Sequence, residues 1–324
     1  MIPKELSSAL RLPIVAAPMF LISDPQLVLS CCMNGIIGTF PALNQRTTEG
    51  YEEWLIEIKT KLDALDAMTP GQSAPFGVNL IVHQSNPRLR ADIKITVKHQ
   101  VPIVITSLGA VSDVVDAVHS YGGLVWHDVT NRRHAEKAIE AGVDGLICVS
   151  AGAGGHAGML NPMPFLSEVR SMFDGTILLA GCISSGRDVV AALTMGADLA
   201  YMGTRFINTQ ESRAPEEYKE AIVNSSVADI IYTAAVSGVP GSFLRSSLEA
   251  AGITKEYWHQ KKKIDFGKEL DVAEAEARAW KTIWSAGQGV TAIDDVVPVG
   301  ELLASIKEEM AQVIEEQQGF LLNV

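Results

Sequence analysis

The chain has 324 residues, a formal net charge of -12 at pH 7 and 47% hydrophobic residues. This length allows two domains, but α/β barrels often reach it as one domain. The acidic balance argues against a nucleic-acid partner, because phosphate binding needs clustered Lys and Arg. No apolar run approaches the ~18 residues of a membrane span, and the N-terminus lacks a signal-peptide pattern, so we expect no membrane partner.

Cysteine usage points to a reducing compartment. The chain has four cysteines, of which Cys31 and Cys32 are adjacent, and none forms a C-x-x-C pair. This pattern argues against a zinc site and is typical of a cytoplasmic protein. Histidines at a metal-ligand spacing are also missing, and we therefore expect no metal.

Short apolar runs alternate with helical segments along the first two thirds of the sequence. The start of the first predicted helix is indicated by the cap residues Ser23 and Asp24, which are followed by Pro25 at the first helical position. Glycine follows several of the helices, as in Tyr121-Gly122, and is a typical helix stop. The predicted strands are 14–20, 36–40, 76–82, 101–107, 123–129, 145–150, 176–183 and 199–206, and the predicted helices are 25–33, 51–65, 88–99, 112–121, 132–141, 164–173 and 187–195.

Eight strands alternating with helices predict an α/β fold of the (β/α)8 or TIM-barrel type. An open doubly wound sheet is the alternative, and strand count and length favour the barrel. We assign residues 1–212 to a barrel that binds a cofactor. Residues 213–275 show helical segments without a convincing strand and predict a small helical domain on the substrate side. Residues 276–324 return to the barrel and end in a closing helix at 299–317.

The candidate site follows from the barrel, because active sites of such barrels lie at the C-terminal ends of the strands. The seventh and eighth strands end in glycine next to a hydroxyl or amide donor, at Gly181 and at Gly203-Thr204. Such turns are the usual phosphate position of the fold. Packing of helices on strands is the alternative explanation for these glycines.

The sixth strand opens into a glycine-rich loop, GAGGHAG at 152–158, with His156 as its one titratable side chain. Glycine is favoured where a backbone comes close to a ligand or takes positive φ. A simple turn with an exposed histidine is the other interpretation of this loop.

Together, five motifs resemble the nitronate monooxygenases, once called 2-nitropropane dioxygenases. They are AAPM at 16–19, FGVNL at 76–80, GAGGHAG at 152–158, GTRF at 203–206 and AGQG at 286–289. The resemblance covers nearly the whole chain. It implies an FMN-dependent barrel that oxidises alkyl nitronates or nitroalkanes with dioxygen to carbonyl compounds and nitrite. A similar glycine-histidine loop occurs in the flavin-dependent enoyl-thioester reductases.

The resemblance also implies roles for individual residues. His156 would be the catalytic residue beside the flavin, and Asn79 and Gln288 would give polar contacts. Some family members carry lysine where this chain has Asp128, and His127 is the alternative source of a cationic contact there. The residues expected to bind the cofactor are Ala17, Pro18, Met19, Asn79, His127, Asp128, Ser150, Gly154, Gly155, Ala180, Gly181, Cys182, Gly203, Thr204 and Gln288.

The proposed chemistry suits histidine, because removing a proton from a nitroalkane needs a base with a pKa near the working pH. We therefore expect His156 to be that base. Two other functions stay open: an FMN-dependent enoyl-thioester reductase, and a flavin-free barrel lyase or isomerase that binds a phosphate. The substrates would be small molecules and dioxygen, and the oligomeric state is open, with a homo-oligomer as one option.

Overall fold

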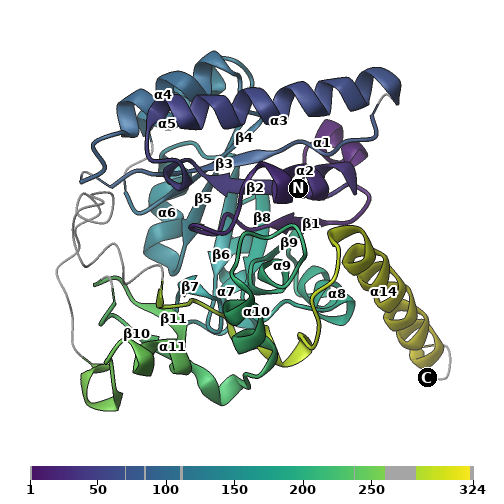
Figure 1. Ribbon diagram of the computed structural model, residues 1–324. Helices are drawn as coiled ribbons and strands as arrows, with labels where there is room; N and C mark the ends of the chain where they lie inside the picture. Colours follow the sequence, from purple (N-terminus) through teal and green to yellow (C-terminus); the bar gives the residue numbers. More distant parts are fainter. Residues whose placement is uncertain are drawn as a thin grey trace.

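Eight parallel strands close a barrel in the computed structural model, which describes residues 2–69, 71–83, 85–109, 112–236, 238–259 and 282–321. The first strand pairs with the last, Val15 opposite Tyr201, so the sheet has no free edge (Figure 1). This closure confirms the barrel and excludes the open sheet. The barrel strands are β1 (Ile14–Ala16), β2 (Ile37–Pro41), β3 (Gly77–Ile81), β4 (Ile103–Ser107), β5 (Leu124–Val129), β6 (Gly145–Val149), β8 (Thr176–Ala180) and β9 (Leu199–Met202).

The helices begin where the sequence places cap residues. Asp24 caps α2, and its carboxylate accepts a hydrogen bond from the backbone N–H of Leu27 at 3.1 Å. Ser185 and Asp188 form a reciprocal capping box at α8. The helices on and beside the barrel are α1 (Lys4–Ala9), α2 (Pro25–Met33), α3 (Thr48–Met68), α4 (Leu89–Lys98), α5 (Ser112–His119), α6 (Arg132–Glu140), α7 (Pro162–Arg170), α8 (Gly186–Thr194), α9 (Thr204–Ile207) and α14 (Val299–Leu321), with a 3-10 turn at Ala42–Asn44.

Alternate residues of the strands form two cores. One fills the barrel interior and includes Val15, Ile105 and Trp126. The other lies between the strands and the surrounding helices and includes Val104 and Phe165. Because successive strand residues point to opposite faces, a strand such as β4 contributes to both cores, with Ile105 in the first and Val104 in the second. This packing fixes the ends of the strands, where the site lies.

The segment after β9 contains strands, and the expectation of an insertion without strands is wrong. Strands β10 (Ile230–Thr233) and β11 (Gly241–Leu244) pair antiparallel, and β11 also pairs with β7 (Gly155–His156) from the glycine-rich loop. Runs of four and two residues are too short to show a strand periodicity, and the partner of β11 is distant in sequence. Helices α10 (Glu216–Val223) and α11 (Arg245–Ala250) and 3-10 turns at Val227–Asp229 and Lys255–Tyr257 complete what is described of this insertion.

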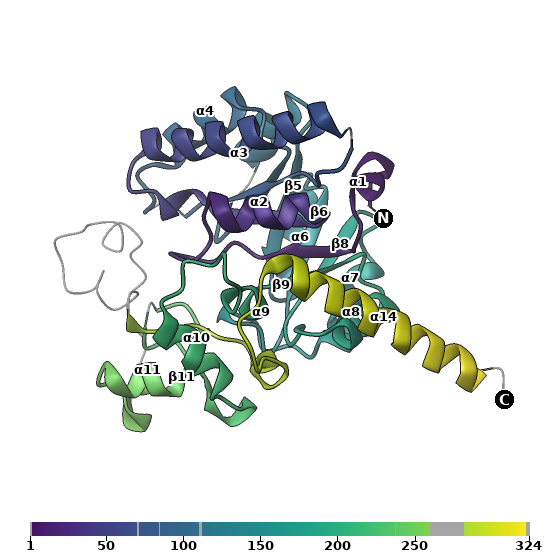
Figure 2. The same ribbon diagram turned by 45° about the vertical axis from the view of Figure 1, so that its right-hand side comes forward.

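The insertion lies at the lower edge of the barrel in Figures 1 and 2, at the end where β7 leaves it. The expected domain boundary at 275/276 falls outside the described residues. The described part of the chain resumes at residue 282, and a 3-10 turn at Gln288–Ala292 precedes α14.

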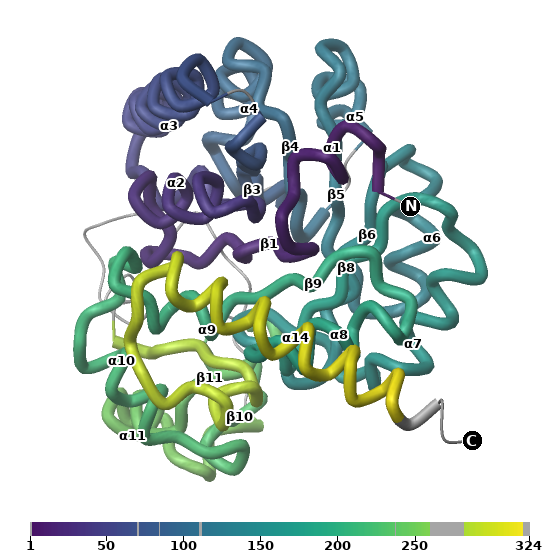
Figure 3. The backbone as a smooth tube through the Cα atoms, turned by 90° about the vertical axis from the view of Figure 1, so that its right-hand side faces the viewer, coloured from purple at the N-terminus to yellow at the C-terminus, as the bar shows by residue number. Residues whose placement is uncertain are grey.

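The closing helix α14 runs across α8 (Figure 3). Leu302, Leu303 and Ile306 in its first half are buried, whereas Ile314 is exposed. Its C-terminal end extends away from the rest of the molecule (Figure 2). Among the described helices, none combines the length and apolar character needed to cross a lipid bilayer.

Candidate active site

One cavity of 1520 Å³ lies at the C-terminal ends of the barrel strands. Pockets for a single small ligand usually measure about 300–1,000 Å³, so this one has room for a cofactor and a second molecule. The structure brings most of the expected site residues into its wall: Ala17, Pro18, Met19, Asn79, His127, Asp128, Gly154, Gly155, His156, Ala180, Gly181, Cys182, Gly203 and Thr204.

Two expected residues are missing from the described wall of this cavity. Ser150 is buried, and its hydroxyl donates to the carbonyl of Ala180 at 2.8 Å, which ties the end of β6 to the end of β8. The side chain of Gln288 is exposed, and its backbone N–H donates to the carbonyl of Gly152 at 2.8 Å. In both cases the contact described is a structural one between two loops or strand ends.

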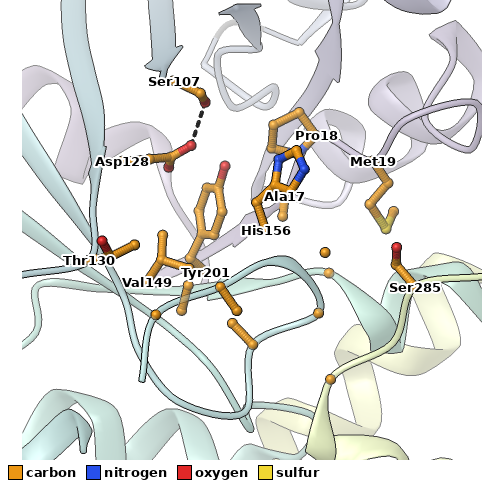
Figure 4. A pocket seen from close by; sticks show the side chains of 18 of the residues that line it. Ala17, Pro18, Met19, Ser107, Asp128, Thr130, Val149, His156, Tyr201 and Ser285 are labelled. Carbon is orange, nitrogen blue, oxygen red and sulfur yellow. Dashed lines mark hydrogen bonds between the residues drawn. The ribbon is translucent and has the colours of Figure 1, made fainter. Parts of the chain in front are cut away.

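His156 is held by the insertion as well as by the barrel. It belongs to β7 and pairs with Gly241 of β11. The imidazole projects towards Ala17 and Pro18 in Figure 4. Burial lowers the pKa of His156 to about 4, so the side chain is neutral at pH 7. This is a correction to the expectation of a base with a pKa near neutrality, and its cause is the loss of water around the ring.

Most glycines of the histidine loop serve packing. A Cβ on Gly154 would lie 2.8 Å from the backbone nitrogen of Gly287, and one on Gly287 would lie 2.6 Å from the carbonyl of Gly152. The two glycine loops therefore pack backbone against backbone. Gly155 differs, because it has φ +65° and no atom lies within 4 Å of a Cβ placed there. Here the backbone conformation requires glycine and the space beside it is open.

The turns after β8 and β9 differ in how they use glycine. Gly181 has φ +129°, and a Cβ there would lie 2.5 Å from the hydroxyl oxygen of Ser150. The next residue, Cys182, also has positive φ, +58°. Gly203 has ordinary backbone angles, and a Cβ would only touch Ala17 and Met19, at 3.7 and 3.9 Å. Neither backbone conformation nor packing therefore requires glycine at position 203, and the missing side chain leaves space on the cavity side.

Polar groups gather on the wall formed by β3, β4 and β5. Asn79 donates from Nδ2 to the hydroxyl of Ser107 at 2.8 Å, and Ser107 donates to Oδ2 of Asp128 at 2.5 Å (Figure 4). Burial raises the pKa of Asp128 to about 6, against the lowering effect of the Ser107 bond. On the same strand, His127 is hydrogen-bonded with Thr106 at 2.8 Å, and burial, followed by the charge of His134, lowers its pKa to about 4.

Several cavity residues were missed by sequence reasoning. Ser107 is the last residue of the predicted fourth strand, so the rule that sites lie at strand ends could have identified it. Tyr201 precedes the turn at Gly203 by two positions and points towards Asp128 (Figure 4). Tyr218 and Trp284 stack with ring centroids 5.1 Å apart and line the cavity from the insertion side. No local sequence signal predicts this pair.

Comparison with known proteins decides the family. The model of the nitronate monooxygenase family matches residues 4–309, which is most of the chain. The chain belongs to the nitronate monooxygenase family. A nitronate monooxygenase of Paraburkholderia phytofirmans is 26% identical over 95% of this chain and 94% of its own length. Family membership implies a flavin cofactor and the oxidation of nitro compounds.

Three other known proteins are similar to this chain. A dehydrogenase of Rhodococcus jostii that acts on a bicyclic carboxyl-CoA is 28% identical over 73% of this chain, which spans 63% of that relative's length. The structure of a nitroalkane oxidase from Streptomyces ansochromogenes matches with a TM-score of 0.78 and 25% identity, over 97% of this chain and 100% of that one. FabK from Thermotoga maritima has a TM-score of 0.80 at 23% identity over 99% and 100% of the two chains, and shares the fold.

The cavity residues fit a flavin on two grounds. The cavity is large enough for a cofactor and a substrate. A Cβ at Gly203 would make only ordinary contacts with Ala17 and Met19, at 3.7 and 3.9 Å, so the protein leaves space beside this glycine. Among the described residues, no cluster of three or more His, Cys, Asp or Glu could hold a metal ion.

Proposed function

We propose that this protein binds FMN and oxidises alkyl nitronates with dioxygen to carbonyl compounds and nitrite. The observation that carries the proposal is a single large cavity that contains both the glycine turns after β8 and β9 and His156. The assignment of the family supports the reaction class, and the choice of FMN rests on the phosphate-binding character of the two turns.

The cofactor would be held from two sides. The backbone of Gly181 and Gly203 and the hydroxyl of Thr204 would bind its phosphate. That hydroxyl accepts from the N–H of Gly287 at 2.9 Å, which leaves its own proton to donate. Ala17 and Met19 would pack against the ring system. The chemistry that a flavin would supply there is to accept electrons from the substrate and to pass them to dioxygen.

His156 would orient the substrate as a neutral imidazole. With its pKa lowered to about 4 by burial, the ring accepts or donates a hydrogen bond at pH 7 without carrying charge. The same shift weakens it as a base, because basicity falls with the pKa of the conjugate acid. We therefore propose that a preformed nitronate, which has already lost its proton, is oxidised faster than the neutral nitroalkane.

The insertion gives the cavity an apolar entrance. Ile283, Tyr218 and the stacked Trp284 line it on this side, and Tyr232 anchors the loop by donating to the carbonyl of Ala157 at 3.0 Å. Apolar and aromatic walls favour a substrate with an alkyl or aromatic body. The reacting nitronate group would then face the polar wall formed by β3, β4 and β5.

Anaerobic stopped-flow reduction of the bound flavin tests this function. We expect rapid bleaching of the flavin by an alkyl nitronate, such as the anion of 1-nitropropane, and slow bleaching by NADPH. Purified protein that is yellow and releases FMN on denaturation supports the cofactor. Fast reduction by NADPH followed by reoxidation with an enoyl thioester would instead indicate the reductase. Protein without any bound flavin, and unable to take up added FMN, would contradict the proposal.

A further inference from the structure

The carboxyl group of Asp128 is anchored on one oxygen and unpartnered on the other. Its Oδ2 accepts from the hydroxyl of Ser107 at 2.5 Å. Its Oδ1 is buried, and no described residue provides it with a hydrogen-bond partner. A buried carboxyl oxygen without a partner is costly, and its cost is removed by a ligand or by a proton. Asp128 lines the cavity, so a ligand there can reach it.

The direction of the hydrogen bonds is fixed by the neighbouring strands. Asn79 donates from Nδ2 to Ser107 at 2.8 Å and also contacts the carbonyl of Ile105 at 3.4 Å. A carbonyl only accepts, so this side of the amide is its NH₂ group. The hydroxyl of Ser107 therefore accepts from Asn79 and gives its own proton to Asp128. If Asp128 holds a proton, that proton lies on Oδ1, the atom without a protein partner.

The surroundings of Asp128 contain neutral titratable groups. Tyr201 faces it from β9 and His156 projects into the same cavity from β7 (Figure 4). His127 precedes it on β5, and His134 of α6 acts electrostatically on His127. Burial holds the pKa of His156 and His127 at about 4 and raises that of Asp128 to about 6. The usual order of carboxyl and imidazole is thus inverted, and Asp128 is the first of these groups to take up a proton as the pH falls.

From this geometry we infer that Asp128 binds an anionic substrate as the neutral acid, donating a hydrogen bond from Oδ1 to an oxygen of the substrate. The inference rests on the proposed function, in which the substrate is a nitronate anion. An ionised carboxylate on this wall would repel such an anion, whereas the protonated form offers it a donor. Substrate binding is therefore coupled to the uptake of one proton by Asp128.

Proton uptake can be counted with nitrate, a planar monoanion that carries the same arrangement of oxygens but is not oxidised. Nitrate is titrated into the flavin-loaded protein by calorimetry at pH 7, in two buffers that differ in ionisation enthalpy. A group with a pKa of about 6 is roughly 10% protonated at pH 7, so we expect about 0.9 proton taken up per nitrate bound. The dissociation constant of nitrate should rise about tenfold per pH unit above pH 7.

Three variants identify the group that takes up the proton. Asp128→Asn keeps a donor but cannot ionise, so nitrate should bind without proton uptake and with little dependence on pH. Ser107→Ala removes the donor to Oδ2, which raises the pKa of Asp128 and should shift the pH dependence upwards. Asp116→Asn, which alters an exposed carboxylate on α5, is the matched control and should behave like the wild type.

Several results would overturn the inference: no nitrate binding at any pH, binding by the wild type without proton uptake, or uptake that persists in Asp128→Asn. The last would assign the proton to another group, such as His156. These results are separate from a failure of the proposed function. A wild-type protein that takes up the proton with nitrate but leaves nitronates unoxidised contradicts the function alone.

Discussion

Replacing Gly203 by alanine tests the cofactor site without disturbing the fold. The added methyl group would lie 3.7 Å from Cβ of Ala17 and 3.9 Å from the sulfur of Met19, which are ordinary contact distances. Backbone angles at this position suit alanine, and Gly→Ala changes at such positions stabilise a protein by about 0.4–1 kcal/mol. We therefore expect the flavin-free protein to be as stable as the wild type or slightly more so.

The bound cofactor should respond in the opposite direction. If the phosphate of FMN lies against Gly203, the methyl group takes up space that the ligand needs. Overpacking by one methyl group typically costs about 1–3 kcal/mol, which corresponds to about 5- to 150-fold weaker flavin binding. Equilibrium dialysis gives the dissociation constant of FMN, and thermal unfolding of the flavin-free protein gives its stability.

A second glycine gives the contrast. Gly181→Ala places a side chain at φ +129° and 2.5 Å from the hydroxyl oxygen of Ser150, so it should lower both stability and flavin affinity. Only Gly203→Ala separates the two effects. If Gly203→Ala binds FMN as tightly as the wild type, the proposed phosphate position is refuted. It is also refuted if the variant loses as much free energy of unfolding as it loses in FMN binding.

Three other changes follow from the site. His156→Asn should retain FMN and lower the turnover of preformed nitronates and neutral nitroalkanes alike, because a neutral imidazole would orient both forms; unchanged turnover of both in steady-state assays would show that the imidazole only packs the loop. Gln288→Ala should change KM and stability little, because the substitution keeps the backbone N–H that donates to the carbonyl of Gly152; a large rise in KM would contradict this. The pKa of His127 is 6.5 in the unfolded chain and about 4 in the folded protein, so between these pH values only the unfolded chain binds the proton. Proton binding to the unfolded chain therefore lowers the free energy of unfolding as the pH falls from 6.5 to 4, by up to about 3 kcal/mol. His127→Asn should therefore flatten the loss of stability between pH 6.5 and 4 in urea unfolding, and an unchanged slope would show that other groups cause it.

The barrel could be predicted from the sequence because its signals are local. Each strand is an apolar run of the right length, and helix starts such as Asp24-Pro25 and glycine stops such as Gly122 lie next to it. Since barrel sites lie at strand ends, most of the residues expected at the site lie in the cavity wall. His156, Gly181 and Gly203 were found in this way.

The features that escaped prediction depend on contacts between distant residues. Strand β7 has two residues and becomes a strand only because β11 pairs with it. The shifted pKa values of His156 and Asp128 follow from their burial by the surrounding structure, which the residue type alone does not report. Gln288 lies in the AGQG motif and Ser150 two residues before the glycine-rich loop, but only the packed structure shows that their hydrogen bonds go to backbone carbonyls.

The pairing of His156 with Gly241 has a consequence for the order in which the protein assembles. All eight barrel strands precede Gly241 in the chain, the last of them ending at Met202. During synthesis the barrel can therefore close, and set the turns at its rim, before β11 has left the ribosome. Pairings between distant residues form late because closing a long loop is entropically costly. The nascent barrel can thus form the polar wall of β3, β4 and β5 first. His156 reaches its final position only when β11 of the insertion pairs with β7.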